Sequence, residues 1–420
     1  MTINRTTFLH FNDVYNIEYA PKFVSSIKST RQRLLGSSSP SEGPGESYVF
    51  TIFSGDAFSP SIMSTVLRGE QMIPLLNALD IDVACLGNHD LDFGVQEFVD
   101  LREQCNFPWI CSNAWDVHEN EPLGGCLEFY IIDKSEEGGP KILTIGLIEK
   151  SWLDTLSSVE PEDLIFEDPC DFVNRRVPEL KAEFGPFDAV VAITHMRMPS
   201  DYALARNGGV HIILGGHDHH YEDTVINNIR ILNSGTDFNA YSVIGVNGRS
   251  ESDGLDTVCR RVDVRTCDDE PDPAIADEVA KFQSLVNQSM DRIVGRSKVR
   301  LDARFSEIRT KETNISNFLA ELLTRATGAD IAILNADTIR ADRFIEAGVL
   351  TMKDLCDLLP MADETMVISI SGEKVLLALE NGVCQYPAME GRFPCVDGVR
   401  FAFDPSKPAG SRGVPGSVYV

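Results

Sequence analysis

The sequence predicts an α/β protein with two domains. Apolar runs of strand length alternate with amphipathic stretches of helix length through the first two-thirds of the chain, and a second α/β pattern follows a long amphipathic helix. The chain has 420 residues, which favours at least two domains. Short polar strings also follow directly after several of the apolar runs, and strand ends of α/β sheets are where side chains converge on a ligand.

Eight apolar runs in the first part are expected to form strands: Phe8–Phe11, Val49–Phe53, Val83–Leu86, Trp109–Ser112, Ile142–Ile148, Ala189–Ile193, Val210–Leu214 and Arg230–Leu232. Five stretches are expected to form helices: Lys22–Leu35, Gln71–Leu79, Val95–Gln104, Asp171–Phe184 and Asp201–Arg206. Pro178 should kink or split the helix over Asp171–Phe184. Three segments are predicted to connect these elements: a loop over Gly36–Glu46 and hairpin tips at Lys134–Pro140 and Asn247–Gly254.

The second domain is expected to follow an acidic link at Asp268–Pro273 and an amphipathic helix over Ala274–Ile293. We therefore predict a first domain over residues 1–272, a linking helix over 273–297 and a second domain over 298–420. Within the second domain, helical periodicity predicts helices over Ile315–Thr327, Met352–Leu359 and Glu373–Asn381. Strands are expected at Ile331–Leu334 and Met366–Ile370.

Charge and hydropathy exclude several classes of partner. The formal net charge of −27 disfavours nucleic acid and anionic membranes. No apolar run is long enough to cross a bilayer, and the N-terminus lacks the apolar core of a signal peptide. The ten Cys residues form no C-x-x-C pairs and are expected to be mostly buried free thiols, which predicts a cytoplasmic protein. The sequence does not indicate an oligomeric state.

Five polar strings carry the chemistry: Asn12–Tyr15, Gly55-Asp56, Gly87–Asp92, Thr194-His195 and Gly215–His219. Two divalent cations about 3.5–4 Å apart need one shared acidic ligand and further nitrogen or oxygen ligands on each side. Asp56 suits the shared position, and one set of ligands is completed by Asn88, His195 and His217. The other set is partly made by Asp13 and His219. Mixed ligands of this kind favour Mn, Zn, Fe, Co or Ni, so we predict two divalent metal ions as cofactors.

His89 is expected to act in catalysis without binding a metal. Asp92 lies three residues later and can orient the imidazole and keep it charged, so that His89 stabilises the phosphoryl oxygens or protonates the leaving group. The nucleophile would be a metal-bridging water or hydroxide. Asp92 could alternatively cap the helix over Val95–Gln104. Arg197 could contact a substrate phosphate or form a surface ion pair with Asp201.

These strings resemble the motifs of the calcineurin-like metallophosphoesterases, specifically the 5′-nucleotidase branch. That family has D-x-H, G-D, G-N-H-(D/E), H and G-H-x-(H/N/Q) in this order, and Gly87–Asp90 and Gly215–His219 match intact. The resemblance implies a four-layer α/β/β/α sandwich for the first domain and a catalytic pair of His89 and Asp92. It also implies six metal ligands, which are Asp13, Asp56, Asn88, His195, His217 and His219.

Tyr15 departs from the family pattern because it stands where the D-x-H motif has its His. Its phenolate could coordinate a metal, its hydroxyl could bond a metal-bound water, or its ring could only pack and leave that metal short of a ligand. We expect that the hydroxyl bonds a metal-bound water and that the ring packs and leaves that metal short of a ligand. His10 is a poor substitute, because it lies within the preceding strand.

The second domain also departs from the family. The string Asn335–Arg340 stands where the family has N-G-G-G-I-R, and the resemblance implies that Asn335 and Arg340 contact the substrate. Met361 occupies the position of the first of two Phe rings that hold the base in nucleotidases, and the chain ends before the second. Met361 is therefore a candidate substrate-binding residue of an altered base clamp.

The expected function is metal-dependent hydrolysis of a small phosphomonoester, either a nucleotide or a sugar phosphate. The alternative is a non-catalytic or impaired binding or regulatory protein with the same fold, which Tyr15 and the altered base clamp would suit. A protein phosphatase is less favoured, because the second domain would restrict access by a folded substrate.

Overall fold

The structure, a computed structural model, describes residues 2–36, 47–153, 161–249, 254–360 and 365–420. The chain divides into two compact units, Met1–Leu285 and Val286–Val420. The predicted loop over Gly36–Glu46 lies almost entirely outside the described residues, and Met361 is also outside them.

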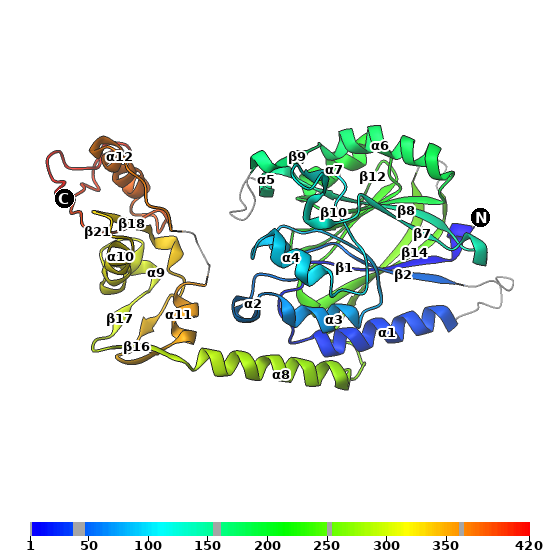
Figure 1. Ribbon diagram of the computed structural model, residues 1–420, viewed down its shortest axis with the longest axis horizontal. Helices are drawn as coiled ribbons and strands as arrows, with labels where there is room; N and C mark the ends of the chain where they lie inside the picture. Colours follow the sequence, from blue (N-terminus) through cyan, green and yellow to red (C-terminus); the bar gives the residue numbers. More distant parts are fainter. Residues whose placement is uncertain (1, 37–46, 154–160, 250–253, 361–364) are drawn as a thin grey trace. The chain divides into compact units, whose positions relative to one another are not determined.

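Two six-stranded sheets form the centre of the first unit (Figure 1). The first has the order β15-β14-β1-β2-β3-β4, with β1 to β4 parallel: β1 Thr6–Phe11, β2 Tyr48–Phe53, β3 Ile81–Cys85, β4 Trp109–Ile110, β14 Ala240–Arg249 and β15 Leu255–Asp263. The second has the order β12-β13-β11-β10-β8-β7: β7 Phe129–Asp133, β8 Lys141–Ile148, β10 Ala189–His195, β11 Ile212–Gly216, β12 Tyr221–Ile226 and β13 Ile229–Ser234.

Residues alternate between two cores along the strands of the second sheet. Val191 and Ile193 of β10 belong to the core shared with the first sheet, whereas Val190 and Ala192 belong to a separate core with α6 (Pro169–Phe184) and α7 (Met198–Asn207). This alternation follows from the two-residue repeat of a strand buried on both faces.

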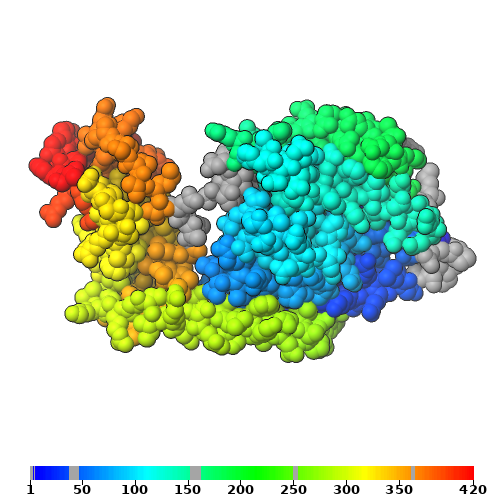
Figure 2. Space-filling view, viewed as in Figure 1, coloured from blue at the N-terminus to red at the C-terminus, as the bar shows by residue number. Residues whose placement is uncertain are grey.

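Helices cover the outer faces of both sheets. In Figure 1, α1 (Ala20–Gly36) and α3 (Ile73–Asn77) run below the first sheet, and α6 and α7 lie above the second. Figure 2 shows the same face in space-filling form, with the blue α1 segment and the green α6 segment on opposite rims of this unit. The first unit thus has helix, sheet, sheet and helix layers, and the predicted mixed α/β class is confirmed.

All eight predicted strands form, with ends that differ by one or two residues. The predicted helix over Gln71–Leu79 is instead a 3₁₀ turn, η2 (Glu70–Met72), followed directly by α3. Pro178 was expected to kink or split its helix, and the helix is not split, because α6 continues from Pro169 to Phe184 with Pro178 inside it. The helix predicted over Val95–Gln104 forms as α4 (Val95–Arg102).

The second unit combines helices with three two-stranded sheets. Its helices are the end of α8 (Pro273–Met290), α9 (Phe305–Ile308), α10 (Asn314–Thr327), α11 (Met352–Leu358) and α12 (Gly372–Val383). Its strand pairs are β16 (Ile293–Ser297) with β20 (Gly348–Thr351), β17 (Leu301–Asp302) with β19 (Phe344–Ile345), and β18 (Ala332–Asn335) with β21 (Pro394–Asp397).

The helix expected over roughly Ala274–Ile293 forms as α8 but ends earlier, at Met290, and Ile293 instead begins β16. One prediction for this part of the chain is wrong. The strand expected over Met366–Ile370 does not form, although the segment is a nearly continuous apolar run of strand length, and its apolar side chains are exposed, such as Met366 at 77%. A strand needs a partner for its backbone hydrogen bonds, and none pairs with these residues among those described.

All ten Cys residues are free thiols, as predicted, but only four of them are buried and the other six are partly exposed. Among the described residues, no helix has the length and apolar character needed to span a membrane.

Candidate metal centre

The polar strings meet where the strands of the two sheets end. Asp13 follows β1, Asp56 follows β2 and Asn88 follows β3 in the first sheet. His195 is the last residue of β10, and His217 follows β11 in the second sheet. Because β1, β2 and β3 are parallel, and β10 and β11 are parallel, the carboxyl ends of each set lie at one edge.

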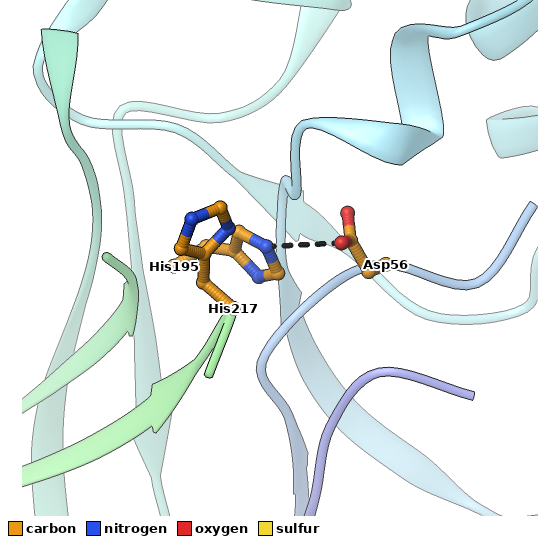
Figure 3. Close-up of side chains that lie close together, drawn as sticks. All are labelled: Asp56, His195 and His217. Carbon is orange, nitrogen blue, oxygen red and sulfur yellow. Dashed lines mark ion pairs between the residues drawn. The ribbon is translucent and has the colours of Figure 1, made fainter. Parts of the chain in front are cut away.

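Three of the predicted ligands form a compact group, which Figure 3 shows. Asp56, His195 and His217 each offer a ligand atom, and these atoms all lie within 4.8 Å of one another. Nε2 of His195 lies 3.2 Å from Oδ2 of Asp56. Oδ1 of Asn88 lies 3.2 Å from Nε2 of His195 and 2.9 Å from Nδ1 of His217. We call Asp56, Asn88, His195 and His217 the first ligand group.

The chemistry of the first ligand group fits a divalent cation. It offers one carboxylate oxygen, one amide oxygen and two imidazole nitrogens, which is the mixed set that Zn and Mn accept. Both Asp56 and His195 are fully buried. Burial opposes the charge on His195, but the adjacent Asp56 carboxylate overcomes this and raises the pKa of His195 to about 10. The buried carboxylate thus requires a neighbouring positive charge, which a protonated imidazole supplies when no cation is bound.

The remaining predicted ligands form a looser set beside the first. Nε2 of His219 lies 3.4 Å from Oδ1 of Asp13. Oδ2 of Asp13 accepts hydrogen bonds from the backbone N–H of His217 at 2.9 Å and from Nδ2 of Asn12 at 2.6 Å. We call Asp13, Asp56 and His219 the second ligand group. Asp56 is counted in both groups because the hypothesis of two cations requires one shared acidic ligand.

Tyr15 points into the second ligand group. Its hydroxyl oxygen lies 2.9 Å from Oδ1 of Asp13, 2.9 Å from Oδ2 of Asp56 and 3.1 Å from Nε2 of His219. Burial, together with the two carboxylates, raises the pKa of Tyr15 far above its ordinary value, so the side chain is a neutral phenol.

His89 and Asp92 form a hydrogen-bonded pair next to these groups. Nδ1 of His89 lies 2.8 Å from Oδ2 of Asp92. Burial lowers the pKa of His89, but the bond to Asp92 and the charge of Asp56 overcome this and raise the pKa to about 9. Asp92 does not cap α4, because Gly94 is the N-cap residue of that helix.

Three candidate ligands have an uncommon backbone conformation. The φ angles of Asp13, Asp56 and His217 are 54°, 63° and 77°, in the left-handed region that residues other than Gly rarely occupy. Such conformations cost about 1–3 kcal/mol each and tend to gather at functional sites. The chain also passes close to itself here, since a Cβ on Gly87 would lie 2.2 Å from Oδ1 of Asp56. This explains why the G-N-H string begins with Gly.

Asp90 supports the site in a way that the sequence did not reveal. Its buried carboxylate accepts hydrogen bonds from the backbone N–H groups of Asp56 at 3.0 Å, Ala57 at 2.7 Å and Gly87 at 2.9 Å. Burial and the nearby Asp56 raise the pKa of Asp90 to about 7. Asp90 thereby ties the loop after β2 to the loop after β3. Its place inside the G-N-H-D string was the only sequence signal for such a role.

His10 does not join the ligands. It is buried within β1, where Nδ1 lies 2.8 Å from Oγ of Ser234 and Nε2 lies 2.8 Å from Oγ of Ser54. These hydrogen bonds join β1 to the end of β13 and to the residue after β2, so His10 supports the strand that leads to Asp13.

The alternative of a surface ion pair between Arg197 and Asp201 is wrong. Arg197 is exposed, and its Nε lies 3.5 Å from Oε1 of Glu149. Asp201 is fully buried on α7, because the helix turns this position toward the second sheet. Arg197 therefore remains a candidate for contact with a substrate phosphate.

The candidate substrate residues of the second unit are engaged within that unit. Oδ1 of Asn335 accepts a hydrogen bond from the backbone N–H of Thr338 at 3.1 Å. Nη1 of Arg340 lies 2.7 Å from Oδ1 of Asp337, which also pairs with Arg309 at 2.8 Å. Asn335 and Asp337 line a pocket of about 630 Å³ in this unit.

Comparison with known families agrees with this arrangement. The family described as "Calcineurin-like phosphoesterase" matches residues 6–221, and "5'-nucleotidase, C-terminal domain" matches residues 293–417. The chain belongs to the calcineurin-like phosphoesterases. Within them, this phosphoesterase has the two-domain composition of the 5′-nucleotidase family.

Individual relatives of this phosphoesterase are distant. It is 25% identical to the trifunctional nucleotide phosphoesterase YfkN of Bacillus subtilis over 97% of this chain, but it spans only 29% of that protein. It is 23% identical to the 5′-nucleotidase of Vibrio cholerae, over 94% of this chain and 78% of the relative. The structure of a 5′-nucleotidase precursor from Thermus thermophilus aligns with a TM-score of 0.64 and 22% identity, over 97% of this chain and 84% of that one. This last likeness shows the shared fold.

Proposed function

We propose that this phosphoesterase hydrolyses a small phosphomonoester, a nucleotide or a sugar phosphate, with the help of two divalent metal ions. One observation carries the proposal: a buried carboxylate, an amide and two imidazoles form the first ligand group, and the paired His89 and Asp92 lie directly beside it. The relatives named as nucleotide phosphoesterase and 5′-nucleotidase support this class of substrate.

Different residues would bind the cations and transfer protons. The first and second ligand groups would hold the cations, which when bound would acidify water for attack and neutralise charge on the phosphoryl group. The backbone N–H of His89 donates to Oδ1 of Asp56 at 2.8 Å, which fixes the position of the imidazole relative to the shared carboxylate. Asp92 holds Nδ1 of His89, so the Nε2 side is left to donate a proton to a phosphoryl or leaving-group oxygen.

Phosphate release from a panel of nucleoside monophosphates and sugar phosphates, with added Mn²⁺, tests this function. We expect turnover of at least one substrate class by the wild type and none by Asp56→Asn. A matched control is Asp263→Asn, which removes a carboxylate paired with Arg265 away from the site and should leave turnover unchanged. Folded wild-type protein without activity on any substrate or metal would contradict the proposal.

A second candidate function is a binding or regulatory protein with impaired catalysis. The observation that favours it is the Tyr15 hydroxyl, which lies among the side chains of the second ligand group. Nucleotide binding without turnover, measured by calorimetry in the presence of Mn²⁺, would support this candidate over the first.

A further inference from the structure

The hydroxyl of Tyr15 lies in the space that a second cation would need. Its oxygen is 2.9–3.1 Å from one atom of each member of the second ligand group. A transition-metal cation would bind the same oxygen and nitrogen atoms at about 2.0–2.2 Å. The phenol therefore makes, through hydrogen bonds, the contacts that a cation would make through coordination.

Neighbouring groups hold the phenol in this position. The backbone N–H groups of Tyr15 and Asn16 donate to Oδ1 of Asp237, at 3.3 Å and 2.9 Å. The Tyr15 ring meets the ring of His89 edge-on, with centroids 6.1 Å apart, and it is tilted against the ring of His219 at 5.3 Å. These backbone bonds and ring contacts favour the observed position of the hydroxyl.

The two ligand groups differ in how closely their atoms approach one another. Among the described residues, Asp56, His195 and His217 are the one set of three acidic, His or Cys residues whose ligand atoms all lie within 4.8 Å. Asp13 and His219 stand outside that set, although they lie 3.4 Å from each other. Two ligands on one cation are separated by at most twice the bond length, or about 4.2 Å. The Tyr15 hydroxyl already contacts all three side chains of the second ligand group, so a cation could bind these atoms together only after the hydroxyl has left.

We propose that Tyr15 makes the two cation positions unequal: the first ligand group binds one cation tightly, and the second binds a cation only when the phenol moves away. This inference rests on the metal site of the proposed function and not on its turnover. It assigns Tyr15 as a positioning residue that controls metal stoichiometry.

Titration of the metal-free 420-residue chain with Mn²⁺ tests the inference. The electron paramagnetic resonance signal of free Mn²⁺ measures the fraction bound, and the spectrum of bound Mn²⁺ distinguishes single ions from coupled pairs. For the wild type we expect one tight position, a second that is at least tenfold weaker, and a single-ion spectrum at one equivalent. Tyr15→His should bind two ions tightly and give the coupled spectrum at two equivalents.

Tyr15→Phe distinguishes two roles of the hydroxyl: it could block the second cation position, or it could bind that cation as a ligand. The variant keeps the ring but loses the hydroxyl, so the second position should bind Mn²⁺ at least tenfold more tightly than in the wild type, with the first unchanged. Weaker binding at the second position would mean that the phenol is a ligand and would overturn the inference. Tyr202→Phe is a matched control, because its hydroxyl contacts Glu222 at 3.4 Å away from both ligand groups.

The possible failures are distinguishable. Two equally tight positions in the wild type would overturn this inference and leave the proposed function standing. No bound Mn²⁺ in the wild type would overturn both. Loss of both ions in Asp56→Asn, with circular dichroism like that of the wild type, would assign the measured binding to the ligand groups that share Asp56.

Discussion

The carboxylate of Asp90 accepts the backbone N–H of Asp56 at 3.0 Å, and this bond joins the shared acidic ligand to the loop that carries Asn88. The same carboxylate accepts two further N–H groups of the loop after β2, from Ala57 and Phe58. The geometry of the site therefore depends on a residue that contacts neither a metal position nor a substrate.

Asp90→Asn is expected to destabilise the first unit by about 1–3 kcal/mol, because an amide N–H₂ would face backbone N–H groups that need an acceptor. Urea unfolding followed by Trp fluorescence measures this, since Trp109, Trp115 and Trp152 all belong to the first unit. Asp100→Asn is the matched control, because this carboxylate on α4 is exposed and accepts a hydrogen bond from Gln96. Equal effects of the two substitutions would contradict the role assigned to Asp90.

His89→Ala is expected to lower kcat about 10²- to 10⁴-fold and to leave the metal content unchanged, because the imidazole handles a proton and does not bind a cation. Phosphate release and elemental analysis of the same samples measure the two effects. His118→Ala is a close control, because His118 forms a similar 2.8 Å pair with Asp163 on the surface. Loss of metal from His89→Ala would place His89 among the ligands.

Asp201→Asn is expected to flatten the pH dependence of stability between about pH 4 and pH 8. Burial, partly offset by the hydroxyl of Thr194, raises the pKa of Asp201 to about 8 in the folded chain, whereas an unfolded Asp has a pKa of about 3.9. In this range the unfolded chain binds fewer protons, so Asp201 reduces stability by up to about 1.4 kcal/mol for each unit of rising pH. Urea unfolding of metal-free protein at three pH values measures the slope, and equal slopes for the two proteins would contradict the assignment.

Asp337→Asn is expected to lower KM for a phosphate ester about fivefold without changing kcat, if Arg340 contacts the substrate. Asp337 pairs with Arg340 and Arg309, and a partly exposed ion pair contributes up to about 1 kcal/mol, which is close to a fivefold change in binding. Asp357→Asn, which loses a pair with Arg343 in the same unit, should leave KM unchanged. An unchanged KM in Asp337→Asn would remove Arg340 from the substrate residues.

Much of the fold follows from local patterns. The strands β1, β2, β8 and β10 were predictable because each is a mostly apolar run of strand length, as expected for strands with both faces covered. The same criterion failed for Met366–Ile370, whose apolar pattern is strand-like but whose backbone has no strand partner among the described residues. Pairing is a non-local property, so an apolar run alone cannot establish it.

The sequence by itself determined which ligand types stand at which strand ends, because strand, turn and ligand lie within a few residues of one another. It thereby predicted the α/β class and the candidate ligands Asp56, His195 and His217. Only the tertiary structure decided which atoms meet. Tyr15 and His219 are 204 positions apart, and their contact depends on how the two sheets pack. The same packing buries Asp201 and directs the Tyr15 hydroxyl between two carboxylates, since long-range contacts arise from the shared core and not from local sequence.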